Sequence, residues 1–191
     1  MVVQFVRFAL FALLVVLLID KQVIAGTAKK NPGAGRMAMK LEISSPMFNN
    51  GQTIPKQYTA DGKNISPPLK WSQPPSGTKS LALICDDPDA PAGTWVHWVV
   101  YGIPANITEL VEGAGLVGNL PDGAKQGTNS FGKIGYGGPS PPPGRPHRYF
   151  FKLYALDFDL SAEAQADARR IEQKITGHTL ANGQLMGTYG R

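Results

Sequence analysis

The 191-residue sequence contains a single cysteine, Cys85, and only 17% of its residues are charged. One cysteine excludes an intramolecular disulfide framework and any zinc ribbon built from cysteine pairs. The lysines and arginines are mostly scattered singly and form no basic stripe among aromatic residues, so nucleic acid is not an expected partner. The net charge of +5 at pH 7 instead favours small anions or anionic surfaces.

Two signatures of enzyme chemistry are also missing. The chain has no G-x-S-x-G segment, which argues against a serine nucleophile on that kind of turn, and no H-x-x-x-H pair of metal ligands. The glycine-rich segment 132–143 matches neither G-x-G-x-x-G nor a Walker A loop, so it does not support nucleotide binding by those routes. We therefore expect no cofactor and no metal.

Glycine (22 residues) and proline (16 residues) are abundant by contrast, and together they exceed the roughly 12% of an average protein. No G-X-Y period accompanies them, which excludes a collagen-like chain. The hydrophobic content of 42% argues against wholesale disorder. The composition therefore predicts a loop-rich, mainly β domain, and the length predicts one domain with an appendage.

An uncharged apolar run at residues 8–19 follows Arg7. It is shorter than the roughly 20 residues of a membrane span and fits the hydrophobic region of a signal peptide, with a cleavage site at Val23–Ala25. We expect an exported protein with three parts: a signal peptide (1–25), a linker (26–39) and a domain (40–191). The alternatives are an N-terminal membrane anchor, or a cytoplasmic protein whose translation starts at Met37 or Met39.

Short apolar or alternating runs between turn residues predict five strands: 40–44, 68–71, 79–84, 94–103 and 148–156. Segment 113–144 shows little periodicity, and a loop of that length is often functional. One amphipathic helix is expected from an N-cap at Ser161 to a stop at Gly177, and a second short helix over 179–186. These elements predict a β-sheet or β-sandwich core with small peripheral helices.

Two polar clusters accompany the predicted strands. The first, Cys85–Pro91, places three aspartates in four positions after a buried strand; its alternative is a turn whose carboxylates bond to nearby backbone N–H groups. The second is His97, which strict alternation puts on one face with Trp95 and Val99, opposite Val96, Trp98 and Val100. The alternative for a single strand histidine is an ordinary core residue.

Two more clusters lie further along the chain. His147 and Tyr149 share a strand face, so an imidazole and a phenol project side by side, unless both simply pack at a strand edge. The glycine- and proline-rich segment 132–143 lets backbone N–H groups approach a ligand closely, and its alternative is a plain surface loop.

Taken in order, the segments DPDAP, HWVVYGIP and GYGGPSPPPGRPHRY resemble the phosphatidylethanolamine-binding protein (PEBP) family, in its bacterial and archaeal Raf-kinase-inhibitor-like branch. The segment YTADGKNISPPLKW and the C-terminal GHTLA and LMGTY also look like that branch. The resemblance covers about Met39 to Arg191. It implies a Greek-key β-sandwich with a few short peripheral α-helices and one small pocket that binds phosphate-like groups, such as the phosphoethanolamine head.

The resemblance also carries over eight ligand-binding residues: Asp87, Asp89, His97, Gly138, Ser140, Pro141, His147 and Tyr149. Many members of the branch have cysteine or alanine where this chain has Ser140. An aspartate would repel an anion, so Asp87 is expected to orient a histidine rather than to touch the ligand.

The expected function is therefore that of a non-enzymatic protein that binds phosphate-like groups or phosphorylated head groups, and the family also includes inhibitors of kinases or proteases. The alternative is a hydrolase or metal-dependent enzyme that uses the cluster Asp87, Asp89, His97 and His147. A kinase or protease target and a homodimer are the partners to consider beside the small anion.

The leader itself is testable. If residues 1–25 are a cleaved signal peptide, the mature protein begins near Gly26 and fractionates outside the cytoplasm. N-terminal sequencing of the purified protein measures this. An intact Met1 in a membrane fraction would support the anchor, and a start at Met37 or Met39 would show that the leader is not translated.

Overall fold

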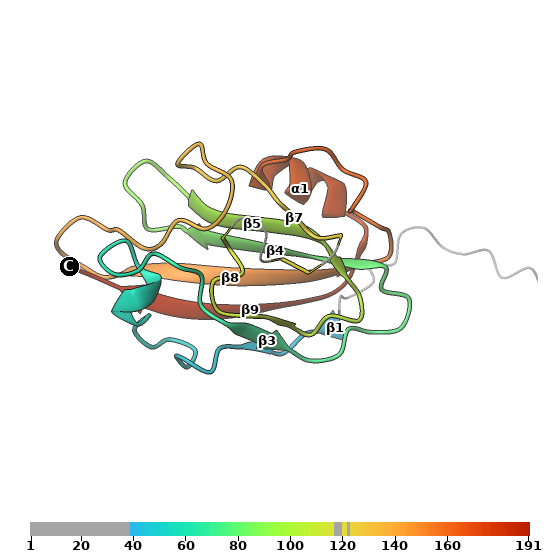
Figure 1. The fold of residues 1–191 in the computed structure, drawn as a ribbon, viewed down its shortest axis with the longest axis horizontal. Helices are drawn as coiled ribbons and strands as arrows, with labels where there is room; N and C mark the ends of the chain where they lie inside the picture. The colour runs from blue at the N-terminus through green and yellow to red at the C-terminus, as the bar shows by residue number, and fades with distance from the viewer. Residues whose placement is uncertain (1–38, 117–119, 122) are drawn as a thin grey trace, which may run out of the picture. The chain divides into compact units, whose positions relative to one another are not determined.

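The computed structural model of the chain describes residues 39–116, 120–121 and 123–191; the expected signal peptide and all of the expected linker except Met39 lie outside these ranges. The described residues form two packed β-sheets with one α-helix, so the predicted mainly β fold is confirmed (Figure 1). No helix among them is long and apolar enough to cross a membrane.

The larger sheet has six strands, in the order β1 (Met39–Lys40), β9 (Thr179–Tyr189), β8 (His147–Leu156), β4 (Ser80–Asp87), β5 (Trp95–Pro104) and β7 (Lys125–Gln126). The smaller sheet has three, in the order β2 (Ile43–Ser44), β3 (Leu69–Trp71) and β6 (Glu109–Leu110). The described helices are η1 (Lys56–Tyr58) and α1 (Ala168–Ile175).

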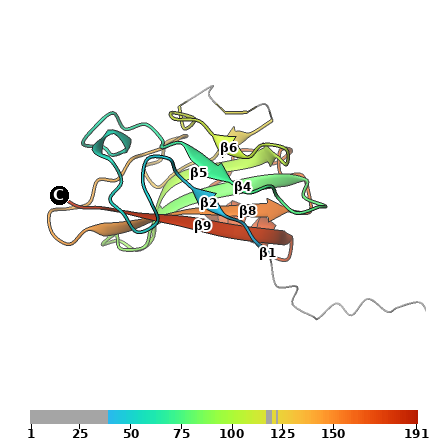
Figure 2. The ribbon, with the colours of Figure 1, turned by 90° about the horizontal axis from the view of Figure 1, so that it is seen from below.

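Strand β4 lies at the centre of the large sheet, and all eight of its residues are buried. Leu81 and Leu83 pack into the core between the two sheets, while Ala82 and Ile84 pack with α1 on the other face. A strand that is covered on both faces has a nearly continuous apolar sequence, which is why the run at 79–84 predicted it. Figure 2 shows β2 and β6 of the small sheet lying over the large sheet.

Strand β8 pairs with β4 although the two are far apart in the sequence (Figure 1). Because β4 is antiparallel to both β5 and β8, its C-terminal end lies beside the first residues of both neighbours. The chain therefore brings Asp87, Trp95, His97, His147 and Tyr149 to one end of the sheet.

Strand β5 contains two more residues than β4 needs for regular pairing. Cys85 pairs with Trp98 and Asp86 with Val96, which leaves His97 as an extra residue and makes a β-bulge. A second irregularity lies near Gly102, whose φ of +66° and close approach to the backbone of Ser161 favour glycine.

The helix begins later than expected. Its N-cap is Asp167, whose Oδ1 accepts the Arg170 backbone N–H at 2.8 Å, and not Ser161. The segment before it is held instead by tertiary contact, because the Tyr101 hydroxyl donates to the Ala164 carbonyl at 3.0 Å. At the other end Gly177 follows the C-cap with φ +82°, as the predicted stop requires.

The predicted second helix over 179–186 is wrong, because this segment belongs to β9 and pairs along its length with β8. Gly183 shows the constraint that overrides local preference: a Cβ there would lie 2.1 Å from the Leu41 carbonyl oxygen of a chain segment crossing the strand. Met39 is likewise not linker, since it pairs with Ala181 in β1. The described residues of segment 113–144 are mostly irregular, as expected, but include β7 (Lys125–Gln126).

The central strand sets the stability of the sandwich. Leu83 is fully buried, so Leu83→Ala should lower the free energy of unfolding by about 2–5 kcal/mol. Val111→Ala is the control, because Val111 is 57% exposed and the change should stay within about 0.5 kcal/mol. Urea unfolding monitored by circular dichroism measures both; equal losses would contradict the assignment of β4 as the centre of the core.

Candidate functional site

The Asp87 carboxylate holds the His147 ring at the end of the sheet. His147 Nδ1 lies 2.7 Å from Asp87 Oδ2, and because a carboxylate oxygen accepts, this nitrogen carries the proton. Asp87 Oδ1 accepts the Asp89 backbone N–H at 2.8 Å. Both oxygens of Asp87 are thus occupied, and the bond leaves His147 Nε2 as the free nitrogen of the ring.

The His97 ring is fixed by a backbone carbonyl. Its Nδ1 lies 2.6 Å from the Gly137 oxygen, so Nδ1 donates and the neutral ring has its lone pair on Nε2. The side chain is 2% exposed, and this burial lowers the pKa of His97 below its usual value of 6.5. Near neutral pH the ring therefore presents a hydrogen-bond acceptor.

The bulge in β5 determines where His97 points. Its ring makes an edge contact with the Tyr149 ring, with centroids 5.1 Å apart, and Trp98 packs in the same core as Tyr149. His97 and Trp98 therefore lie on one side of the sheet. The alternation expected from the sequence is therefore wrong from Trp98 onward. Trp98 and Val100 lie on the same face as His97, and Val99 packs on the α1 side. The extra residue at the bulge shifts the alternation of side chains by one position.

Tyr149 supplies a polar atom that nothing in the fold uses. Its side chain is 1% exposed, and its hydroxyl has no hydrogen-bond partner among the described residues. Burial, and next the charge of Asp87, raise the pKa of Tyr149, so the hydroxyl keeps its proton. A buried unsatisfied donor is costly and calls for an explanation, which a bound acceptor would supply.

These groups share one pocket of about 300 Å³. Its walls are Asp87, Ala90, Pro91, Ala92, Trp95, His97, Phe131, Ser140, Pro141, Pro142, His147 and Tyr149. Six of the eight residues expected from the sequence are among them, and Asp89 and Gly138 are not. The polar atoms lie on the strand ends, while the surrounding loops contribute mainly apolar side chains.

Asp89 points away from the pocket and pairs with Arg148. Its carboxylate accepts the backbone N–H, Nε and Nη2 of Arg148 at 2.7–2.9 Å. Hydrogen bonds from the Arg148 side chain lower the pKa of Asp89 to about 2, so the carboxylate is ionised at any ordinary pH. Asp89 thus ties the β4–β5 turn to β8 and does not face the pocket itself.

Gly138 shapes the rim without lining it. Its N–H donates to Asn64 Oδ1 at 2.7 Å, and a Cβ at this position would lie 2.8 Å from the Thr59 backbone. Asn64 itself has φ +57°, a left-handed conformation that asparagine tolerates better than most residues. The Ala60 N–H also bonds to the Pro139 carbonyl, at 2.9 Å, so the segment before β3 holds the rim in place.

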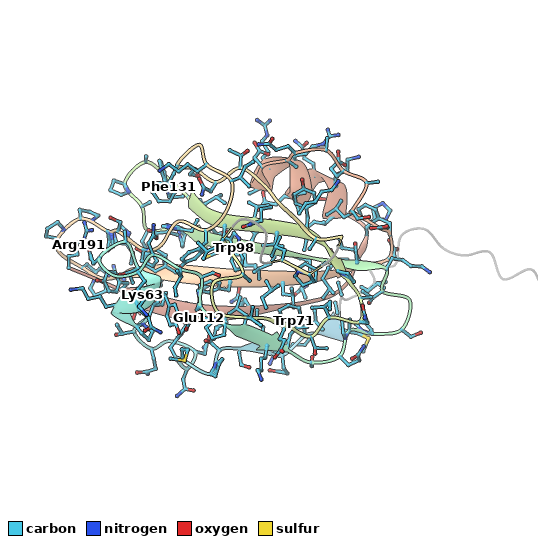
Figure 3. The ribbon with its side chains drawn as sticks, viewed as in Figure 1. Lys63, Trp71, Trp98, Glu112, Phe131 and Arg191 are labelled. Carbon is cyan, nitrogen blue, oxygen red and sulfur yellow. The ribbon has the colours of Figure 1, made fainter. Side chains whose placement is uncertain are left out.

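Ser140 connects the rim to Arg191. Arg191 Nη2 lies 2.9 Å from Ser140 Oγ, and the same guanidinium pairs with Asp61. Hydrogen bonds from Arg191 and Tyr189 lower the pKa of Asp61 to about 2. Figure 3 shows Arg191 and Phe131 toward the same end of the molecule, at the left of that view. The Ser140 hydroxyl thus links the pocket wall to a permanent positive charge.

A sequence model of the family described as phosphatidylethanolamine-binding protein matches residues 44–190. The chain belongs to the PEBP family. It is 49% identical over 151 residues to a UPF0098 protein of Methanothermobacter thermautotrophicus, covering 79% of this chain and 99% of that one. It is 50% identical over 153 residues to a UPF0098 protein of Aquifex aeolicus, covering 79% and 89%.

Solved PEBP structures resemble this one over nearly their whole length. The crystal structure of YbcL from Escherichia coli, described as a member of the mammalian PEBP family, gives a TM-score of 0.75 at 34% identity, covering 80% of this chain and 99% of that one. A PEBP homologue from Chlamydia trachomatis, CT736, gives 0.72 at 40% identity, covering 81% and 99%. The predicted family is therefore confirmed.

Two aromatic residues of this PEBP pocket were not among the expected site residues. Trp95 and Phe131 make an edge contact with centroids 5.4 Å apart, and Phe131 also contacts the edge of the His97 ring at 5.5 Å. Trp95 could have been found, since it shares the predicted strand face with His97. Phe131 has no such signal, because it lies in segment 113–144, where no periodicity indicates direction.

The metal-enzyme alternative finds little support in this geometry. Asp89 is turned toward Arg148, and among the described residues no three His, Cys, Asp or Glu side chains form a group that could hold a metal ion. The Cys85 thiol is buried, and burial raises its pKa, which makes it a poor nucleophile. PEBP proteins are binding proteins, and the pocket offers hydrogen-bonding groups rather than an activated nucleophile.

The protonation of His97 can be measured directly. We expect an NMR titration midpoint for its ring below 6.5, with the resonance identified by its loss in His97→Gln. The folded state then binds fewer protons than the unfolded state, so the free energy of unfolding should fall as pH drops below 6.5 toward that midpoint. His97→Gln should flatten this slope. A midpoint at or above 6.5 would contradict the buried, neutral ring.

Proposed function

We propose that this PEBP protein binds the phosphate group of a small phosphomonoester in the pocket lined by His97, His147 and Tyr149. The observation that carries the proposal is the convergence of three polar groups that the fold leaves unused. Nδ1 of each imidazole donates to a protein oxygen, which leaves Nε2 unused, and the Tyr149 hydroxyl has no partner among the described residues. A phosphate presents several oxygens and, as a monoanion, one O–H group.

Proton balance favours the monoanion. The Tyr149 hydroxyl can donate to a phosphate oxygen, whereas the Nε2 atom of a neutral His97 ring can only accept. Nε2 of a neutral His147 ring is a second acceptor, so a monoanion with its one O–H satisfies one ring and the other must take up a proton. A phosphomonoester loses its second proton near pH 6, so at neutral pH the dianion has no O–H and both protons must be taken up on binding. Binding is therefore coupled to proton uptake, and affinity should fall as pH rises from about 6 to 8.

The carboxylate oxygens of the nearby aspartates are engaged by protein donors. Asp87 is occupied by His147 and by a backbone N–H, and Asp89 by Arg148. Arg191, which pairs with Asp61, also donates to Ser140 Oγ in the pocket wall. Serine at this position, where many relatives of the branch have cysteine or alanine, thus adds a hydroxyl beside a guanidinium.

The apolar wall indicates that the ligand has more than a phosphate. A volume of about 300 Å³ is at the small end of typical ligand pockets and exceeds what inorganic phosphate fills. Trp95, Phe131 and Pro141 line the remaining space. A short organic substituent, as in a phosphorylated head group, fits this division between a polar floor and an apolar wall.

Tyr149→Phe separates binding from folding. Removing the hydroxyl takes one hydrogen bond from a charged ligand, so phosphoethanolamine affinity should fall roughly ten- to a hundredfold. The free energy of unfolding should stay equal or rise, because the lost hydroxyl has no partner in the free protein. Isothermal titration calorimetry at pH 6 and pH 8, with urea unfolding alongside, measures both quantities.

His178→Ala is the matched control, because this third histidine is exposed and pairs with Asp157 away from the pocket. It should bind as the wild type does. Unchanged affinity in Tyr149→Phe, or affinity that does not fall from pH 6 to pH 8, would overturn the proposed site. Release of inorganic phosphate during the titration would instead establish the hydrolase alternative.

A further inference from the structure

A second hollow adjoins the pocket. It has a volume of about 270 Å³ and shares His147 and Pro142 with the first pocket. Its walls are Asp89, Pro142, Pro143, Arg145, Pro146 and His147. The two hollows are therefore neighbours across one imidazole and one proline.

Of the two charged residues that line the second hollow, Asp89 has its carboxylate engaged and Arg145 has free donors. Asp89 and Arg148 neutralise each other through three hydrogen bonds. Arg145 is exposed and makes no hydrogen bond or ion pair with any residue in the described part of the chain. Its charge nevertheless reaches Asp89, whose pKa it helps to lower. The guanidinium donors of Arg145 thus remain available in the wall of the hollow.

The backbone around Arg145 is held in place. Prolines at 142, 143 and 146 restrict φ on both sides of it. Pro146 packs against Gly190, where an added Cβ would lie 2.9 Å from the proline Cγ. His147, two residues further on, is fixed by Asp87. The guanidinium therefore projects from a constrained turn next to the phosphate site.

We propose that this hollow is a second anion subsite, in which Arg145 favours phosphomonoesters that carry a carboxylate close to the phosphate. The inference rests on the proposed function, because the phosphate must occupy the first pocket. O-phosphoserine and O-phosphoethanolamine form a suitable pair of probes, since they differ only in the carboxylate. The site should prefer phosphoserine.

The expected preference is moderate because Arg145 is exposed. Ion pairs of this kind correspond to about a two- to fivefold difference in affinity, and the difference should shrink when the salt concentration rises from 20 mM to 500 mM. Phosphoethanolamine, which has no carboxylate to place beside Arg145, should show the smaller salt dependence of the two.

The experiment is calorimetric titration of both compounds into wild type, Arg145→Gln, Arg145→Glu and Arg169→Gln. Arg145→Gln should abolish the preference with phosphoethanolamine affinity nearly unchanged, and Arg145→Glu should reverse it. Arg169 is the matched control: it too is exposed and unpaired within the described ranges, but it lies on α1, on the other face of the large sheet. Arg169→Gln should keep the wild-type preference.

The outcomes separate the two proposals. Equal affinity of wild type for both compounds, or a phosphoserine preference that persists in Arg145→Gln and Arg145→Glu, would overturn the second subsite and leave the phosphate pocket standing. If neither compound binds to wild type, the phosphate pocket is wrong and the second subsite falls with it.

Discussion

The hydrogen bond between Asp87 and His147 is the contact on which the rest of the site depends. It joins the last residue of β4 to the first residue of β8, so it closes the central pair of strands at the end where the pocket lies. It also fixes the tautomer of His147 and, with the Asp89 backbone N–H, occupies both oxygens of Asp87. One buried bond thus joins the two strands at this end of the sheet and fixes the orientation and the tautomer of the ring.

Contacts between loops hold the walls of the pocket around this bond. The segment before β3 holds the glycine-rich rim through Asn64 and Gly138, and Arg191 fastens Ser140 from the end of β9. Asp89 and Arg148 clamp the turn between β4 and β5. None of these contacts is close in sequence, so the pocket is rigid only once the whole sandwich has formed.

The parts of this structure that could be predicted are those with a local cause. The buried apolar run at 79–84 predicted β4, and the ordered motifs identified the family and six of the pocket residues. Residues 179–186 of β9 were mistaken for a helix because their pairing with β8, and the approach of Leu41 to Gly183, are set by segments distant in the sequence. Asp89 was wrongly expected to bind the ligand, because its partner Arg148 is distant in the chain. Phe131 was missed because its direction is also set by distant residues such as Trp95.

The two irregularities in β5 have a joint consequence. The extra residue at His97 moves Trp98 and Val100 onto the inner face, and the second irregularity near Gly102 brings Ile103 back to the same face. Between the two irregularities the inward-facing residues have even numbers, whereas toward both ends of the strand they have odd numbers. Deleting the extra residue at His97 would bring Val96 and Trp98 into regular alternation, so the strand would keep its two faces but lose the side chain that lines the pocket. The bulge therefore adds a pocket histidine to the inner face of β5 without displacing the core residue Trp98.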